Sequence, residues 1–172
     1  LLGQRISLRS TPGRGSCFTV DLPLAAHLAP AVQAAPLPAQ PLAGLRVWLI
    51  EDDTAVRDAM VARLRQWGAQ VNALSSRADL ELQLAGAPAL PALVVSDQRL
   101  PDGTGLQCVA RIREYAGRSV SALIVTGDTA PSDIAGLVSS GLPVLHKPFS
   151  GGELLSSLQD ALRRTDAEVS AA

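Results

Sequence analysis

Ionisable and hydroxyl side chains stand at the ends of four short apolar runs of this sequence. Glu51 and Asp52 follow RVWLI, Asp97 follows LVVS, Thr126 ends SALIVT, and Lys147 follows LPVLH. Carboxylates that pack together repel one another unless a cation lies among them, and a set of oxygen ligands suits Mg²⁺. A lysine and a hydroxyl suit a phosphoryl group. If these residues converge, they predict Mg²⁺-assisted phosphoryl transfer with an aspartate as the nucleophile.

Alternating strand and helix patterns from residue 45 onward would bring these side chains together. The apolar runs predict buried strands at 46–50, 70–74, 92–96, 121–126 and 142–146. Helical spacing of apolar residues predicts helices at 54–68, 76–86, 104–117, 131–141 and 151–164. Strands this apolar favour a parallel sheet that helices cover on both faces. We therefore predict an α/β, flavodoxin-like (βα)5 doubly wound fold with strand order 2-1-3-4-5, whose ligands bind at the carboxyl ends of the strands.

Four segments carry a resemblance to a known family. VWLIEDD, LVVSDQRLPDGTG, LIVTGD and LHKPF, in this order, resemble the signature segments of the response-regulator receiver domain, over residues 45–164. The resemblance implies that Asp97 is the phospho-acceptor and that Mg²⁺ is the cofactor. It also implies that Asp52 is a direct metal ligand, that Glu51 acts largely through water, and that the backbone carbonyl of Arg99 completes the metal shell.

The same resemblance gives roles to the residues at the last two strand ends. Thr126 would bond one phosphoryl oxygen and Lys147 would pair with another. Gly105 would shape the loop after Asp97, and the peptide bond before Pro148 is often cis in the family. Val144 occupies a position where many members carry an aromatic residue, so the aromatic switch of those members has no counterpart here.

Simpler roles compete with chemistry at several positions. Asp53 is better explained as a helix N-cap than as a metal ligand, and Glu51 alone could be a solvated loop residue. His146 is expected to be structural or exposed. Cys108 shares a helix face with apolar residues and is expected to be a packing or surface thiol.

The first 44 residues differ in composition from the rest. Residues 1–24 alternate apolar and polar side chains around TPGRGS, which predicts a β-hairpin. This segment resembles the last hairpin of a histidine-kinase ATPase domain. Residues 25–44 are rich in Ala and Pro and are expected to form a linker, and 165–172 a C-terminal tail. The order of these parts predicts a piece of a hybrid histidine kinase, and the absence of an initiator Met predicts a fragment of a longer protein.

Composition limits the partners. The 172-residue chain has a formal net charge of −1, which gives no reason to expect nucleic acid as a partner. No apolar run approaches the roughly 20 residues that cross a bilayer, so we expect no direct membrane contact by this fragment. Two distant cysteines form no disulfide framework, which favours a cytoplasmic location, even if the parent kinase is anchored in a membrane.

Three functions remain open on the sequence. The first is a phosphorelay receiver that takes a phosphoryl group onto Asp97 from a phosphohistidine, either of its own kinase core or of a histidine phosphotransfer protein. The second is a pseudo-receiver that only docks partners. The third is a phosphatase with an aspartyl-phosphate intermediate, which would need an acid where Arg99 stands. Whether the fragment itself counts as an enzyme stays open, whereas the parent protein is expected to be a phosphotransferase.

Overall fold

The computed structural model describes residues 5–13, 15–21, 40–127 and 136–170. The chain divides into two units, Leu1–Pro36 and Leu37–Ala172. The described part of the first unit is an antiparallel hairpin of β1 (Arg5–Thr11) and β2 (Gly15–Asp21), which confirms the predicted hairpin. The predicted linker lies mostly outside the described residues. Its last five residues, 40–44, are described, and the Leu42 side chain is fully buried in the core of the second unit.

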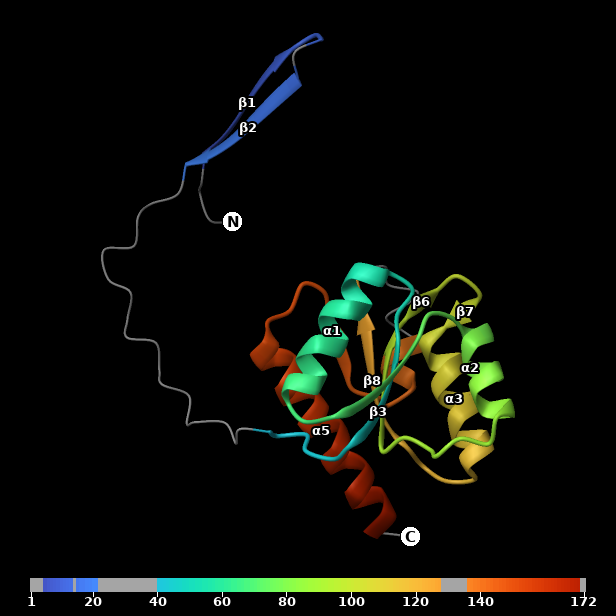
Figure 1. Ribbon diagram of the computed structural model, residues 1–172. Helices are drawn as coiled ribbons and strands as arrows, with labels where there is room; N and C mark the ends of the chain where they lie inside the picture. The colour runs from blue at the N-terminus through green and yellow to red at the C-terminus, as the bar shows by residue number, and fades with distance from the viewer. Residues whose placement is uncertain (1–4, 14, 22–39, 128–135, 171–172) are drawn as a thin grey trace, which may run out of the picture. The chain divides into compact units, whose positions relative to one another are not determined.

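A five-stranded parallel sheet forms the centre of the second unit (Figure 1). Its strands are β3 (Arg46–Ile50), β4 (Gln70–Leu74), β5 (Leu93–Asp97), β8 (Ser121–Thr126) and β9 (Val144–His146). They lie in the order β4-β3-β5-β8-β9, and every neighbouring pair is parallel. Counted along the second unit alone, this is the predicted order 2-1-3-4-5, so the doubly wound fold is confirmed.

Helices cover both faces of this sheet, with α1 and α5 on one face and α2 and α3 on the other (Figure 1). The helices are α1 (Thr54–Gln66), α2 (Arg77–Ala85), α3 (Gly105–Ala116) and α5 (Gly151–Ser170). The helix predicted at 131–141 lies partly outside the described residues, and 136–139 are helical. Helix α5 continues past the predicted end at Arg164, because no Gly or Pro interrupts the chain before Ser170.

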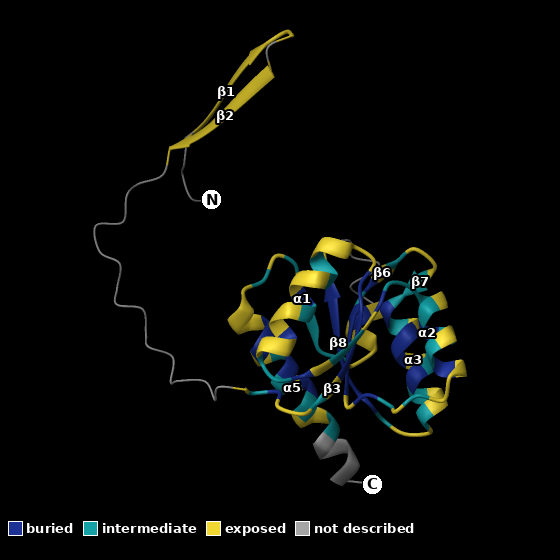
Figure 2. Ribbon diagram, viewed as in Figure 1, coloured by how far each residue is buried: buried dark blue, intermediate teal, exposed yellow. Residues whose placement is uncertain are grey.

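The core consists of two apolar layers, one on each face of the sheet. Along β3, Val47 and Leu49 belong to the layer under α1 and α5, whereas Trp48 and Ile50 belong to the layer under α2 and α3. Figure 2 shows the result, with buried strands between helices whose outer surfaces are exposed. Strands buried on both faces are mostly apolar, so the ionisable side chains gather where the strands end.

Polar side chains cap the first turns of the helices that follow β3 and β5. Asp53 caps α1, with its Oδ1 accepting a hydrogen bond from the backbone N–H of Val56 at 3.0 Å. Thr104 and Gln107 form a capping box at the start of α3.

Between β5 and α3, β6 (Arg99–Leu100) and β7 (Gly103–Thr104) pair as a small antiparallel ribbon. Among the described helices, none combines the length and the apolar character needed to cross a membrane.

Candidate functional site

Three carboxylates meet at the carboxyl ends of β3 and β5. Because these strands are neighbours in the sheet, Glu51 and Asp52 after β3 lie beside Asp97 at the end of β5. One carboxylate oxygen of each residue lies within 4.8 Å of the other two. The three differ in environment, since Glu51 is 2% exposed, Asp97 is half-buried and Asp52 is exposed. The predicted convergence of acidic side chains is therefore present.

Lys147 brings a cation into this cluster from the loop after β9. Its Nζ donates to Glu51 Oε2 at 2.9 Å and to Asp97 Oδ2 at 2.5 Å. Burial by itself would lower the pKa of Lys147, but the hydrogen bonds and charges of Asp97 and Glu51 outweigh it and raise that pKa above its usual 10.5. Lys147 thus stays protonated between the two acids.

Glu51 is the carboxylate most affected by its surroundings. Burial raises its pKa above the usual 4.5, and the nearby Asp97 charge acts in the same direction. The hydrogen bond and the charge of Lys147 oppose that rise without cancelling it. The ionised form of Glu51 is therefore held in place at an energetic cost, which is common at sites that bind a cation.

The backbone fixes the orientation of Asp97. Its Oδ1 accepts a hydrogen bond from the backbone N–H of Arg99 at 3.1 Å, while Oδ2 faces Lys147. Gly105 packs so close that a Cβ there would overlap with the Asp97 carbonyl and lie 2.9 Å from Ser96 Oγ. Only glycine fits at that position. Both oxygens of the Asp97 carboxylate therefore have defined partners.

The two remaining predicted residues lie at the same end of the sheet. Thr126 is fully buried at the end of β8, and its carbonyl accepts the backbone N–H of Lys147 at 2.7 Å. Arg99 begins β6, directly beyond the end of β5. The phosphoryl contact of the Thr126 hydroxyl and the metal contact of the Arg99 carbonyl stay predictions.

Arg57 is a residue of this site that the sequence did not point to. It lies in the first turn of α1, and its Nη1 donates to the carbonyls of Glu51 at 2.8 Å and Asp52 at 3.0 Å. Its Nη2 donates to Thr54 Oγ1 at 3.1 Å. Its only sequence signal is a basic residue one turn into the helix that follows the acidic run, which is a common arrangement on exposed helices.

Other residues singled out in the sequence take structural positions. His146 is exposed, and Cys108 is fully buried in the core, where burial raises the pKa of its thiol to about 11. Cys108 is therefore not a nucleophile at neutral pH. The peptide bond between Lys147 and Pro148 is cis.

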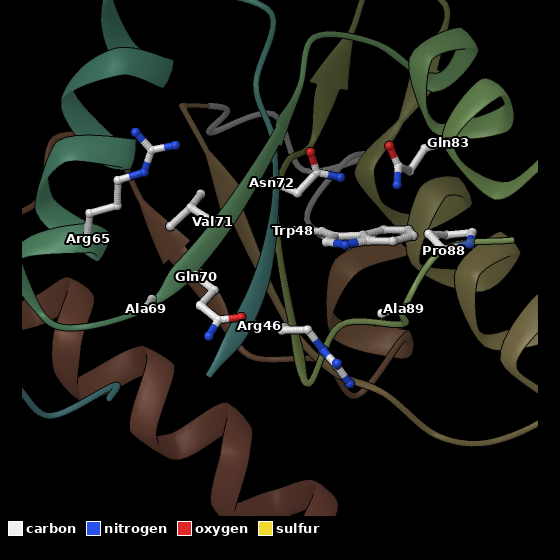
Figure 3. A pocket seen from close by; sticks show the side chains of 10 residues that line it. All are labelled: Arg46, Trp48, Arg65, Ala69, Gln70, Val71, Asn72, Gln83, Pro88 and Ala89. Carbon is white, nitrogen blue, oxygen red and sulfur yellow. The ribbon is translucent and has the colours of Figure 1, made fainter. Parts of the chain in front are cut away.

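A separate cavity of about 600 Å³ opens around the edge strand β4. Figure 3 shows the Trp48 indole on one side of β4, near Pro88, and Arg65 on the other side. The residues that line it are Arg46, Trp48, Arg65, Ala69, Gln70, Val71, Asn72, Gln83, Pro88 and Ala89. They include no carboxylate, and Arg46 and Gln70 begin their strands, so this cavity lies away from the acidic cluster at the strand ends.

The donor set fits a hard divalent cation. All three clustered side chains offer carboxylate oxygens, which Mg²⁺ prefers, and they stand at the edge of the sheet where parallel α/β folds bind their ligands. A thiol or imidazole, which softer metals favour, is absent from this described cluster. The cluster is thus chemically suited to Mg²⁺.

Comparison with known proteins identifies the family. The family model of the response regulator receiver domain matches residues 47–159, about two thirds of the chain. The chain belongs to the response-regulator receiver family. This receiver domain is 32% identical over 123 residues to the KDP operon transcriptional regulatory protein KdpE of Escherichia coli (strain K12), covering 70% of this chain and 52% of KdpE. It is 36% identical over 114 residues to the sensor protein TorS of the same strain, covering 66% of this chain and 12% of TorS.

Solved structures agree with the fold of the receiver. A CheY-like receiver domain protein from Methanospirillum hungatei JF-1 superposes with a TM-score of 0.63 at 20% identity, covering 73% of this chain and 99% of that one. The chemotaxis protein CheY4 of Vibrio cholerae gives a TM-score of 0.60 at 25% identity, covering 70% and 100%. The chain spans about half the length of most transcriptional regulators that it matches. The receiver is thus a domain of two-component signalling.

Proposed function

We propose that this receiver accepts a phosphoryl group from a phosphohistidine onto Asp97 in a Mg²⁺-dependent reaction. The observation that carries the proposal is the convergence of Glu51, Asp52 and Asp97 at neighbouring strand ends, where Lys147 binds two of them, Glu51 and Asp97. Carboxylates in this arrangement suit a divalent cation, and one of them is oriented for attack.

In the proposed reaction an Asp97 carboxylate oxygen forms a bond to phosphorus while the bond from phosphorus to the donor imidazole nitrogen breaks. The imidazole leaves with the electron pair of the broken bond. Mg²⁺ held by Glu51, Asp52, Asp97 and the Arg99 carbonyl would neutralise charge on the phosphoryl oxygens.

Lys147 and Thr126 would hold the transferred group. The Lys147 ammonium has three N–H donors and already contacts Asp97, so it can turn one donor toward a phosphoryl oxygen that arrives there. The Thr126 hydroxyl, at the end of the next strand, would donate to another phosphoryl oxygen. Both act by positioning and by charge, which supply most of the rate in phosphoryl transfer.

We further propose that the receiver belongs to a hybrid histidine kinase. The similarity to TorS, a sensor protein, and the hairpin of β1 and β2, whose sequence resembles the end of a kinase ATPase domain, support this arrangement. The phosphoryl donor would be a phosphohistidine of the same kinase or of a histidine phosphotransfer protein. A phosphatase is disfavoured, because Arg99 stands where that chemistry needs an acid.

Intact-mass measurement after incubation with acetyl phosphate and Mg²⁺ tests the phospho-acceptor. We expect the full chain to gain ~80 Da, the mass of one phosphoryl group, and to gain nothing when EDTA replaces Mg²⁺. Asp97→Asn should abolish the gain, whereas Asp58→Asn, which removes an exposed carboxylate of α1, should leave it intact. Labelling that survives in Asp97→Asn would refute the assignment, and no labelling of the wild type would favour a pseudo-receiver.

A further inference from the structure

Arg57 binds two backbone carbonyls of the loop between β3 and α1 and the hydroxyl of Thr54. Its Nη1 lies 2.8 Å from the Glu51 carbonyl oxygen and 3.0 Å from the Asp52 carbonyl oxygen, and its Nη2 lies 3.1 Å from Thr54 Oγ1. The guanidinium therefore closes the short loop between β3 and α1 on itself. A planar fork with several fixed donors is suited to holding two carbonyls at once, which a lysine ammonium does less well.

The contacts of Arg57 with the Glu51 and Asp52 carbonyls restrict where the carboxylates of the same two residues can lie. The Glu51 N–H donates to the Leu74 carbonyl at 3.1 Å, so the Glu51 backbone is anchored at both its N–H and its C=O. The Asp52 carbonyl is held by Arg57, while the exposed Asp52 carboxylate stays near those of Glu51 and Asp97. Three like charges would otherwise drive this exposed side chain and its loop outward.

We infer that Arg57 is a positioning residue that preorganises the Mg²⁺ site by fixing the carbonyls of Glu51 and Asp52. This inference rests on the proposed function, because it assumes that the acidic cluster binds Mg²⁺. The hydrogen bonds of Arg57 reach Glu51, Asp52 and Thr54 and not the proposed nucleophile, Asp97. It acts through the loop backbone, which sets where the Glu51 and Asp52 carboxylates stand.

The effect of removing Arg57 on Mg²⁺ affinity distinguishes a role in positioning from a role of its charge alone. A guanidinium beside a cation site repels the incoming ion, so its removal would strengthen Mg²⁺ binding if Arg57 acted only through its charge. If Arg57 acts by positioning, its removal weakens Mg²⁺ binding. The direction of the change therefore separates the two roles.

A comparison of two metals sharpens this distinction. Mg²⁺ requires a nearly ideal octahedral geometry, whereas Ca²⁺ accepts flexible coordination. A loosened loop should therefore lose more affinity for Mg²⁺ than for Ca²⁺, and the ratio of the two affinities should fall. A pure change of charge would move the affinities for both divalent ions together.

Calorimetric titration of the full chain with MgCl₂ and with CaCl₂ measures both affinities. We expect Arg57→Ala to weaken Mg²⁺ binding about tenfold, the size found when a partner of a metal ligand is removed, and to weaken Ca²⁺ binding by a smaller factor. Arg57→Lys keeps the charge without the fork and should resemble Arg57→Ala. Arg65→Ala removes an exposed arginine from the last turn of the same helix and should change neither affinity.

Several outcomes would overturn the inference. Unchanged or tighter Mg²⁺ binding in a folded Arg57→Ala or Arg57→Lys variant would do so, as would equal losses for the two metals. Circular dichroism establishes that each variant is folded, and the lysine variant remains the test if the alanine variant unfolds. Failure of the wild type to bind Mg²⁺ would instead refute the metal site itself, whereas binding by the wild type with no effect of Arg57 would refute only the inference.

Discussion

Asp52→Asn should stabilise the protein when no divalent ion is present. The Asp52 carboxylate has oxygens within 4.8 Å of those of both Glu51 and Asp97. Two unit charges at that separation repel by roughly 0.9 kcal/mol in water, and by about half as much at physiological ionic strength. Lys147 offsets part of the sum over the two pairs. We therefore expect the substitution to raise the free energy of unfolding by about 0.5–1 kcal/mol.

Mg²⁺ should reverse this order of stability. An ion that binds only the folded wild type at ten times its dissociation constant adds about 1.4 kcal/mol. The Asp52→Asn variant, which lacks one ligand, should gain much less. Thermal unfolding followed by circular dichroism measures both effects, since 1 kcal/mol corresponds to a shift of about 2–4 °C in a chain of this size. In EDTA the variant should melt above the wild type, and in MgCl₂ below it.

The matched control for this prediction is Asp58→Asn. Asp58 is exposed on α1 and does not belong to the acidic cluster, so its substitution should leave both melting temperatures close to those of the wild type. Raising the salt concentration to 1 M should shrink the advantage of Asp52→Asn in EDTA, because exposed charges are screened. A variant that melts below the wild type in EDTA, or that gains as much from Mg²⁺, would show that like-charge repulsion does not govern this site.

Three further substitutions test how the site is held. Because the pKa of Glu51 is raised above 4.5, the folded state binds its proton more tightly than the unfolded state does. The free energy of unfolding should therefore fall as pH rises from about 4.5 through the raised pKa. Urea unfolding across that range should show that the free energy of unfolding of Glu51→Gln depends less on pH than that of the wild type. Lys147→Ala leaves the buried Glu51 carboxylate without its cation and should cost about 3 kcal/mol in urea unfolding at pH 7, with a smaller loss at pH 4, where Glu51 takes up a proton. Gly105→Ala places a Cβ against the Asp97 backbone and should cost about 2–3 kcal/mol in the same assay, whereas Gly136→Ala, where a Cβ meets open space, should be nearly neutral.

The sequence could predict those features that have a local pattern. Apolar runs that end in Asp97 or Lys147 predicted both the strands and the residues that meet at their ends, because a parallel sheet brings its carboxyl ends to one edge. Asp53 as the N-cap of α1 followed from its place between a strand and a helical pattern, and the structure confirms it. The strand order followed from the match to a doubly wound fold.

The features that were missed depend on contacts with the backbone or on weak stop signals. Arg57 binds carbonyl oxygens, which every residue has, so no pattern of residue types marks its targets. Helix α5 continues past the predicted end at Arg164 to Ser170, because no Gly or Pro follows Arg164 to mark an end. The ribbon of β6 and β7 has two residues in each strand, which is too short for an alternating pattern.

The environments of the three carboxylates also support the proposal that Asp97, and not one of its neighbours, is the nucleophile. Glu51 is buried and its pKa is raised, so its charge is better balanced by a cation than exposed to a reacting phosphorus. Asp52 is exposed, and its loop is fixed through Arg57 at the backbone. Asp97 and Glu51 each have one oxygen that accepts a hydrogen bond from a backbone N–H and another that accepts one from Lys147 Nζ. The two bonds of Asp97 are shorter, at 3.1 and 2.5 Å against 3.4 and 2.9 Å, and its side chain is 12% exposed against 2% for Glu51, so Asp97 is both better oriented and more accessible to a donor. A carboxylate held at both oxygens loses little orientational freedom on attack, which is the condition for rapid in-line transfer.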